Sequence, residues 1–176
     1  MQPGVVYTTF HFPESGANVI TTDSSDWATN CPEYKVTAVQ VLPLCHPLRL
    51  AEEVATVDQL SGGRLIFGVG RSGFAHTYAT YGVDYGESRE RFAEVLTILK
   101  RAFTEEQFSH NGRYYRYDNV RLAPRPLQMP WPEIRIAAAS PDTYEEVGTM
   151  GHPIFVAART GNLSELAPLV KRYRTA

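Results

Sequence analysis

The first group of residues suited to chemistry is a glycine-rich stretch near the middle of the chain. Gly68, Gly70 and Gly73 have no side chain to hold a ligand away from the backbone, and Arg71 lies among them. Its guanidinium is a permanent cation that suits phosphate. No Gly-Lys-Ser or Gly-Lys-Thr follows, so the stretch is not a P-loop, and an ordinary tight turn is the alternative interpretation.

A second polar segment follows the apolar residues 134–139, which are expected to form a buried strand. Ser140-Pro141 begins the next helix in this interpretation, with Ser140 as the N-cap and Pro141 at the first helical position. Free N–H groups at such a helix start attract anions.

The third candidate is His46, which lies at the end of an expected strand and before a helix that starts at Pro47. It could contact a substrate or catalyse proton transfer, although a lone histidine at this position is more often a capping or orienting residue. The neighbouring Cys45 would need a lowered pKa to react, and nothing in the sequence indicates one.

Apolar periodicity indicates how these residues are positioned. Helices are expected at 47–60, 87–108, 144–150 and 163–173, and strands at 35–42, 65–69, 134–139 and 154–157. This alternation predicts parallel strands with right-handed crossovers. The pair Asn111-Gly112 predicts a hairpin. Residues 75–86 are expected to form a loop. Two short strands are expected at 5–10 and 18–22, which makes the first part of the chain all-β.

Composition limits the classes of function. The chain has 176 residues, 43% hydrophobic, which suits one domain. A net charge of -2 gives no basic surface for nucleic acid, and no apolar run approaches the roughly 20 residues that span a membrane. Together with the absence of a signal-like N-terminal segment, this predicts a cytoplasmic location. Cys31 and Cys45 have no metal-ligand spacing, so we expect free thiols and no metal, with a disulfide between them as the alternative.

The segments 46–64, 81–83, 89–104 and 134–143 resemble the bacterial luciferase-like family of flavin- and deazaflavin-dependent monooxygenases and reductases. The resemblance covers most of residues 42–176. It implies an α/β fold of the (β/α)8 (TIM) barrel type, of which this chain supplies only about four or five of the eight strands. It also implies a small-molecule substrate and FMN as cofactor, with F420 as the alternative.

The resemblance assigns roles to the candidate residues. Arg71, Ser140 and Thr143 occupy the family's flavin-phosphate positions, and the cofactor site is completed by Gly70, Ser72 and Ala139. The alternative is structural: Ser140 only caps its helix and Arg71 only pairs with a carboxylate. The family's usual catalytic histidine follows a strand that has no counterpart here, which leaves His46 as the catalytic candidate.

Residues 1–41 depart from the luciferase-like pattern. They resemble the C-terminal molybdopterin-binding β domain of formate dehydrogenase alpha subunits, which implies that His11, Asn18 and Lys35 could contact molybdopterin guanine dinucleotide. Both families have a strand similar to 37–41. The chain is therefore interpreted as two segments, 1–41 and 42–176, and as a possible chimera; a divergent first barrel strand is the alternative.

Three hypotheses of function follow. The first is a flavin-dependent luciferase-like oxidoreductase or monooxygenase, represented by part of its barrel. The second is a catalytically inactive chimera or fragment that forms a homo-oligomer through open sheet edges. The third is a molybdopterin-binding element of a formate dehydrogenase.

Overall fold

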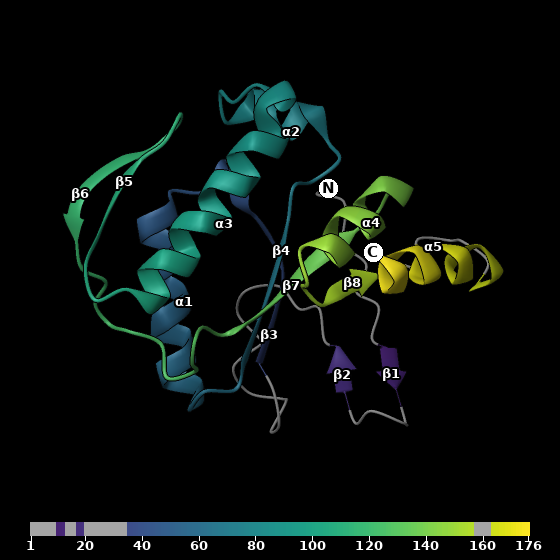
Figure 1. Ribbon diagram of the computed structural model, residues 1–176, viewed down its shortest axis with the longest axis horizontal. Helices are drawn as coiled ribbons and strands as arrows, with labels where there is room; N and C mark the ends of the chain where they lie inside the picture. The colour runs from purple at the N-terminus through teal and green to yellow at the C-terminus, as the bar shows by residue number, and fades with distance from the viewer. Residues whose placement is uncertain (1–9, 13–16, 20–34, 157–162) are drawn as a thin grey trace, which may run out of the picture.

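The computed structural model describes residues 10–12, 17–19, 35–156 and 163–176 (Figure 1). The elements are β1 (Phe10–Phe12), β2 (Ala17–Val19), β3 (Lys35–Val41), the 3-10 helix η1 (Leu42–Leu44), α1 (Pro47–Ser61), β4 (Leu65–Gly70), α2 (Ala75–Thr80), the 3-10 helix η2 (Tyr85–Glu87), α3 (Ser88–Thr104), β5 (Phe108–Asn111), β6 (Arg116–Val120), β7 (Glu133–Ala138), α4 (Pro141–Thr149), β8 (Ile154–Val156) and α5 (Leu163–Thr175).

The central sheet has four parallel strands in the order β3-β4-β7-β8. Because parallel strands point the same way, the carboxyl ends of β3, β4 and β7 meet at one edge of the sheet. This arrangement confirms the predicted alternation of strands and crossover helices. The hairpins β1–β2 and β5–β6 are separate two-stranded sheets.

The core lies between this sheet and the helices α1 and α3, which run beside each other in Figure 1. Strand β4 is buried along its whole length, as its unbroken apolar sequence predicts. Leu65, Phe67 and Val69 alternate onto the face that packs against the two helices. Burying one such side chain contributes about 1.5–3 kcal/mol, so this strand is firmly held where it ends at Gly70.

Helix α1 begins at Pro47 as predicted and ends at Ser61, one residue beyond the predicted end, and it buries one charged side chain. The charged residues of an amphipathic helix usually face water, but Asp58 is fully buried. Its carboxylate accepts hydrogen bonds from the backbone N–H groups of Leu127 and Gln128, at 2.7 and 2.9 Å, and from Gln128 Nε2 at 2.7 Å. Gln128 Nε2 also donates to the carbonyl of Leu65, so Asp58 fixes the connector before β7 against the start of β4.

Three expected elements differ in detail. The predicted loop 75–86 contains α2 and η2, and α3 ends at Thr104, so that Phe108 begins a strand. The hairpin is confirmed, but its turn is wider than Asn-Gly alone because Asn111 pairs with Arg116. Glu94 of α3 accepts hydrogen bonds from the N–H groups within this turn, which favours the wider loop over a two-residue one.

Several expectations concern the rest of the chain. Strand β1 overlaps the expected strand 5–10 at Phe10, and β2 overlaps the expected strand 18–22 at Asn18 and Val19. The remainder of the two expected strands and Cys31 lie outside the described residues. Within the described ranges, Cys45 is a free thiol, no group of ligating side chains could hold a metal ion, and no helix is both long and apolar enough to span a membrane.

Candidate functional site

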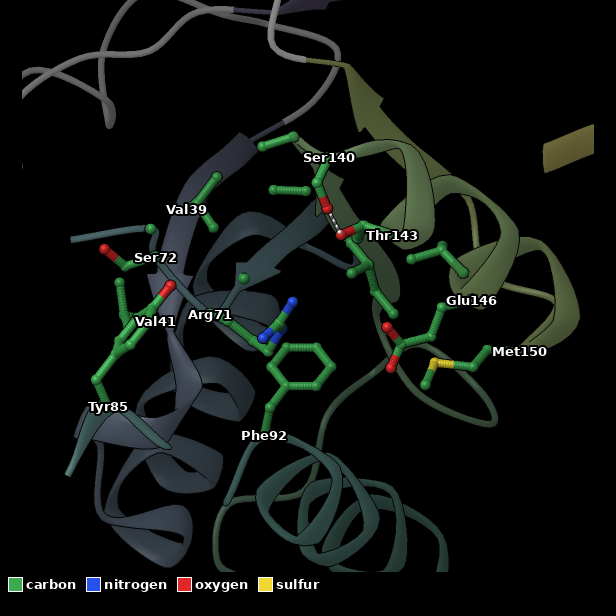
Figure 2. A pocket seen from close by; sticks show the side chains of 16 residues that line it. Val39, Val41, Arg71, Ser72, Tyr85, Phe92, Ser140, Thr143, Glu146 and Met150 are labelled. Carbon is green, nitrogen blue, oxygen red and sulfur yellow. Dashed lines mark hydrogen bonds between the residues drawn. The ribbon is translucent and has the colours of Figure 1, made fainter. Parts of the chain in front are cut away.

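A cavity of about 430 Å³ opens at the carboxyl ends of β3, β4 and β7 (Figure 2). The strand ends contribute Val39, Val41 and Ile136, and helix α4 forms the opposite wall, with Phe92 of α3 below. All six residues predicted to bind the cofactor line this one cavity: Gly70, Arg71, Ser72, Ala139, Ser140 and Thr143. The parallel pairing of β4 with β7 explains how such distant segments of sequence meet.

Arg71 supplies the positive charge of the cavity. It directly follows β4, and Figure 2 shows its side chain pointing into the cavity. Its backbone carbonyl accepts a hydrogen bond from the hydroxyl of the buried Tyr78, which holds the loop in place. Among the described residues no carboxylate lies within ion-pair distance of the Arg71 guanidinium, so the expected alternative of a simple ion pair has no support in this part of the chain.

The start of α4 supplies hydrogen-bond donors on the other side of the cavity. Ser140 has the extended conformation of an N-cap and Pro141 follows it, as predicted. The side chain does not cap the helix, however, because the Ser140 hydroxyl is 2.7 Å from the Thr143 hydroxyl and accepts no backbone N–H. The first-turn N–H groups of a helix have no partner within it. In α4, however, Pro141 has no N–H and the N–H of Thr143 donates to the Ser140 carbonyl at 3.0 Å, so the polar groups that this helix start brings to the cavity wall are the two hydroxyls.

Gly70 is required by packing and not by a turn. A Cβ atom at this position would lie 2.8 Å from Val39 Cγ1 and 3.4 Å from Ala137 Cβ, because β3 and β7 approach from both sides. A Cβ atom at Gly73 would meet nothing within 4 Å, so the structure has room for a side chain at this position. Ser72 between them has a left-handed φ of 61°, which turns the chain sharply after Arg71.

The sequence interpretation missed the acidic group of the cavity. Glu146 lines the wall one helical turn beyond Thr143, and its carboxylate lies 3.4 Å from Arg89 Nη1 of α3. Thr143, Glu146, Val147 and Met150 all line the cavity at the spacing of one helix face. That spacing is visible in the sequence and could have identified Glu146.

His46 lies elsewhere. It does not line the cavity, and it caps α1 by accepting a hydrogen bond from the N–H of Arg49 at 3.4 Å from Nδ1. Its ring makes edge contacts with Tyr115 and Tyr117. Burial raises the pKa of the nearby Cys45 thiol and raises the pKa of Tyr117 to about 12, so neither is prepared to give up a proton. The contacts of His46 are those of a capping residue, and its catalytic role stays a prediction.

The fold and the site define the class of protein: an α/β protein with part of a barrel sheet and an anion-attracting cavity at the carboxyl ends of its strands. The family model for luciferase-like monooxygenases matches residues 36–176, and the chain therefore belongs to that family. The match begins within β3, ahead of the predicted boundary between residues 41 and 42, and that division stays a prediction.

Individual relatives agree with this assignment. The chain is 38% identical over 140 residues to an uncharacterized protein of Sinorhizobium fredii, covering 80% of this chain and 40% of that protein. It is 36% identical over 91 residues to an FMNH(2)-dependent dimethylsulfone monooxygenase of Pseudomonas putida, covering 50% of this chain and 25% of that enzyme. The crystal structure of monooxygenase RslO1 from Streptomyces bottropensis superposes with a TM-score of 0.73 at 30% identity, over 80% of this chain and 43% of that one.

The chain thus spans less than half of the length of these relatives. Their shared fold confirms the luciferase-like barrel, of which the described sheet forms four parallel strands.

Proposed function

We propose that this chain belongs to a flavin-dependent oxidoreductase and that its cavity binds the phosphate group of FMN. The observation that carries the proposal is the Arg71 guanidinium, which points into the cavity without a carboxylate partner among the described residues. The start of α4 lines the same cavity with the hydroxyls of Ser140 and Thr143. A guanidinium together with a helix N-terminus is a favourable environment for phosphate.

The residues present fit such a group. Arg71 would hold the phosphate through charge-assisted hydrogen bonds, and the Ser140 and Thr143 hydroxyls would orient it. Apolar side chains, among them Ile136 and Val147, would exclude water around it. The flavin supplies the redox chemistry when it is bound, and the chain supplies binding and orientation.

The name of the Pseudomonas putida relative, an FMNH(2)-dependent enzyme, favours FMN over F420. A small organic molecule is proposed as the substrate. His46, the candidate for proton transfer, caps α1 and does not line the cavity.

The test is titration of the whole chain with FMN and with riboflavin, which lacks the phosphate. Arg71→Ala should weaken FMN binding by about 2 kcal/mol, roughly thirtyfold, and leave riboflavin binding unchanged. Arg64→Ala is the matched control, because Arg64 is exposed and precedes β4 at the opposite end of the strand. Equal losses for both ligands would mean that Arg71 supports the loop and does not contact phosphate.

A second proposal concerns association. Within the described sheet, β3 and β8 each pair with a strand on one side only, and unpaired strand edges recruit other chains. We propose a homo-oligomer that forms through these edges. Sedimentation should show a dimer or larger species at tens of micromolar, and a single monomer species would contradict this proposal.

A further inference from the structure

The guanidinium of Arg71, which carries the positive charge of the cavity, is not anchored at the end of its side chain. Within the described ranges, neither an ion pair nor a hydrogen bond engages this guanidinium. A long side chain without such an anchor takes its direction from the backbone that carries it, because the allowed rotamers depend on that backbone. The contacts that fix the backbone at Arg71 therefore decide how often the guanidinium points into the cavity.

The backbone directly after Arg71 has an unfavourable conformation. Ser72 has a φ of 61°, in the left-handed region that residues other than glycine rarely adopt. Its hydroxyl accepts a hydrogen bond from the N–H of Phe74 at 3.3 Å, which is a contact within the turn itself. Such a conformation persists only where the surrounding structure holds it. The turn thus needs a contact with another element of the fold.

Tyr78 of α2 supplies that contact. Its hydroxyl donates a hydrogen bond to the carbonyl of Arg71, which belongs to the peptide group between Arg71 and Ser72. The Tyr78 side chain is fully buried, so its hydroxyl has a fixed position. Burial raises the pKa of Tyr78, although the Arg71 cation opposes this, and the hydroxyl therefore stays protonated and can donate at neutral pH.

The same tyrosine also packs behind a second residue of the cavity wall. Tyr85 lines the cavity, and its ring meets that of Tyr78 edge to face, with 5.1 Å between the ring centroids. Figure 2 shows Tyr85 on the side of the cavity that lies opposite Ser140 and Thr143. Tyr78 itself is not among the residues that line the cavity. It therefore supports two lining residues without reaching the space that a ligand would occupy.

We infer that Tyr78 is a positioning residue: its hydroxyl holds the turn after β4 in the conformation that directs the Arg71 guanidinium into the cavity. This inference rests on the proposed function and adds to it a residue that acts on the phosphate only through Arg71. Removal of the hydroxyl should weaken the binding of a phosphate-bearing ligand while the cavity wall stays in place.

The size of the effect follows from the single hydrogen bond. The net contribution of one such bond changes an equilibrium about fivefold. Without it, the left-handed Ser72 favours release of the turn, and the apparent affinity falls with the fraction of molecules in which Arg71 points into the cavity. Tyr78→Phe should therefore weaken FMN binding about three- to fivefold, which is less than the roughly thirtyfold loss expected for Arg71→Ala.

The experiment measures the dissociation constants of FMN and riboflavin by equilibrium dialysis for the unchanged chain, Tyr78→Phe, Arg71→Ala, the double variant and Tyr173→Phe. Tyr78→Phe keeps the ring and its contact with Tyr85, so the packing of the core is preserved. Tyr173→Phe is the matched control. Its hydroxyl also donates to a backbone carbonyl, that of His152 at 3.0 Å, and Tyr173 does not line the cavity.

Three results are expected. Tyr78→Phe should weaken FMN binding and leave riboflavin binding unchanged. In the Arg71→Ala background the same substitution should change FMN affinity by less than about 1.5-fold, because the guanidinium that it positions is absent. Tyr173→Phe should lower the urea midpoint about as much as Tyr78→Phe does, and it should leave both dissociation constants unchanged.

A purely structural role for Tyr78 gives a different pattern. FMN and riboflavin would then lose affinity equally in Tyr78→Phe, and its effect on FMN would add fully to that of Arg71→Ala in the double variant. Either result would overturn the inference, as would unchanged FMN affinity in Tyr78→Phe, while FMN binding by the unchanged chain would leave the proposed function standing. Failure of the unchanged chain to bind FMN would reject both.

Discussion

The buried carboxylate of Asp58 gives the sharpest prediction about stability. Its two oxygens accept three hydrogen bonds, from the N–H groups of Leu127 and Gln128 and from Gln128 Nε2. In Asp58→Ala these donors lose their acceptor inside the protein. Leaving a buried donor unsatisfied costs about 1–3 kcal/mol, and the donors can regain part of this from water, so we expect a loss of about 3–5 kcal/mol.

Asp58→Asn is the matched comparison, because it keeps the shape and one acceptor oxygen. If Oδ2 stays an oxygen it still accepts from the N–H groups of Leu127 and Gln128, while the new amide nitrogen faces Gln128 Nε2, another donor. The loss should be about 1–2 kcal/mol. Urea unfolding followed by circular dichroism measures both variants. A loss below about 1 kcal/mol for Asp58→Ala would refute the reasoning, since the three bonds would then contribute almost nothing.

Three further predictions concern other sites. Ser140→Ala should cost less than about 0.5 kcal/mol in urea unfolding, because the hydroxyl bonds Thr143 and not the helix backbone; a loss of 1 kcal/mol or more would restore the capping role. Burial, with the charge of Lys100, lowers the pKa of His152, so its contribution to stability is complete above the unfolded value of about 6.5 and is lost as pH falls from that value through the lower pKa of the folded state. Urea midpoints across this range should fall less steeply in His152→Gln. Glu94→Ala should cost about 2–4 kcal/mol and, by hydrogen exchange, loosen the hairpin first, because its carboxylate holds the turn; unchanged exchange would contradict this.

The sequence predicted the central architecture well because its strongest signals are local. The apolar run of β4 and the Ser140-Pro141 helix start each depend on neighbouring residues, and both are confirmed. The residues of the candidate cavity could also be chosen together, since they follow strands whose carboxyl ends must meet at one edge.

The failures concern interactions between segments far apart in the chain. Asp58 lies among charged residues of an amphipathic helix, so its periodicity indicated an exposed position, and its partners are 69 and 70 residues away. The width of the hairpin turn likewise depends on Glu94, which lies 20 residues before Tyr114. Local propensity cannot predict these hydrogen bonds, because the two carboxylates meet their N–H donors only after the helices have packed.

Strand β4 separates a buried hydrogen-bond network that stabilises the fold from the cavity that would bind a ligand. At its first residue, the Leu65 carbonyl joins the Asp58 and Gln128 network, and after its last residue, Arg71 enters the cavity. Six extended residues place these ends roughly 17 Å apart, beyond the range at which substitutions usually influence one another. Mutations at the two ends should therefore have additive effects. Substitutions at the Leu65 end of β4 can therefore raise the free energy of unfolding while substitutions at the Arg71 end change ligand binding.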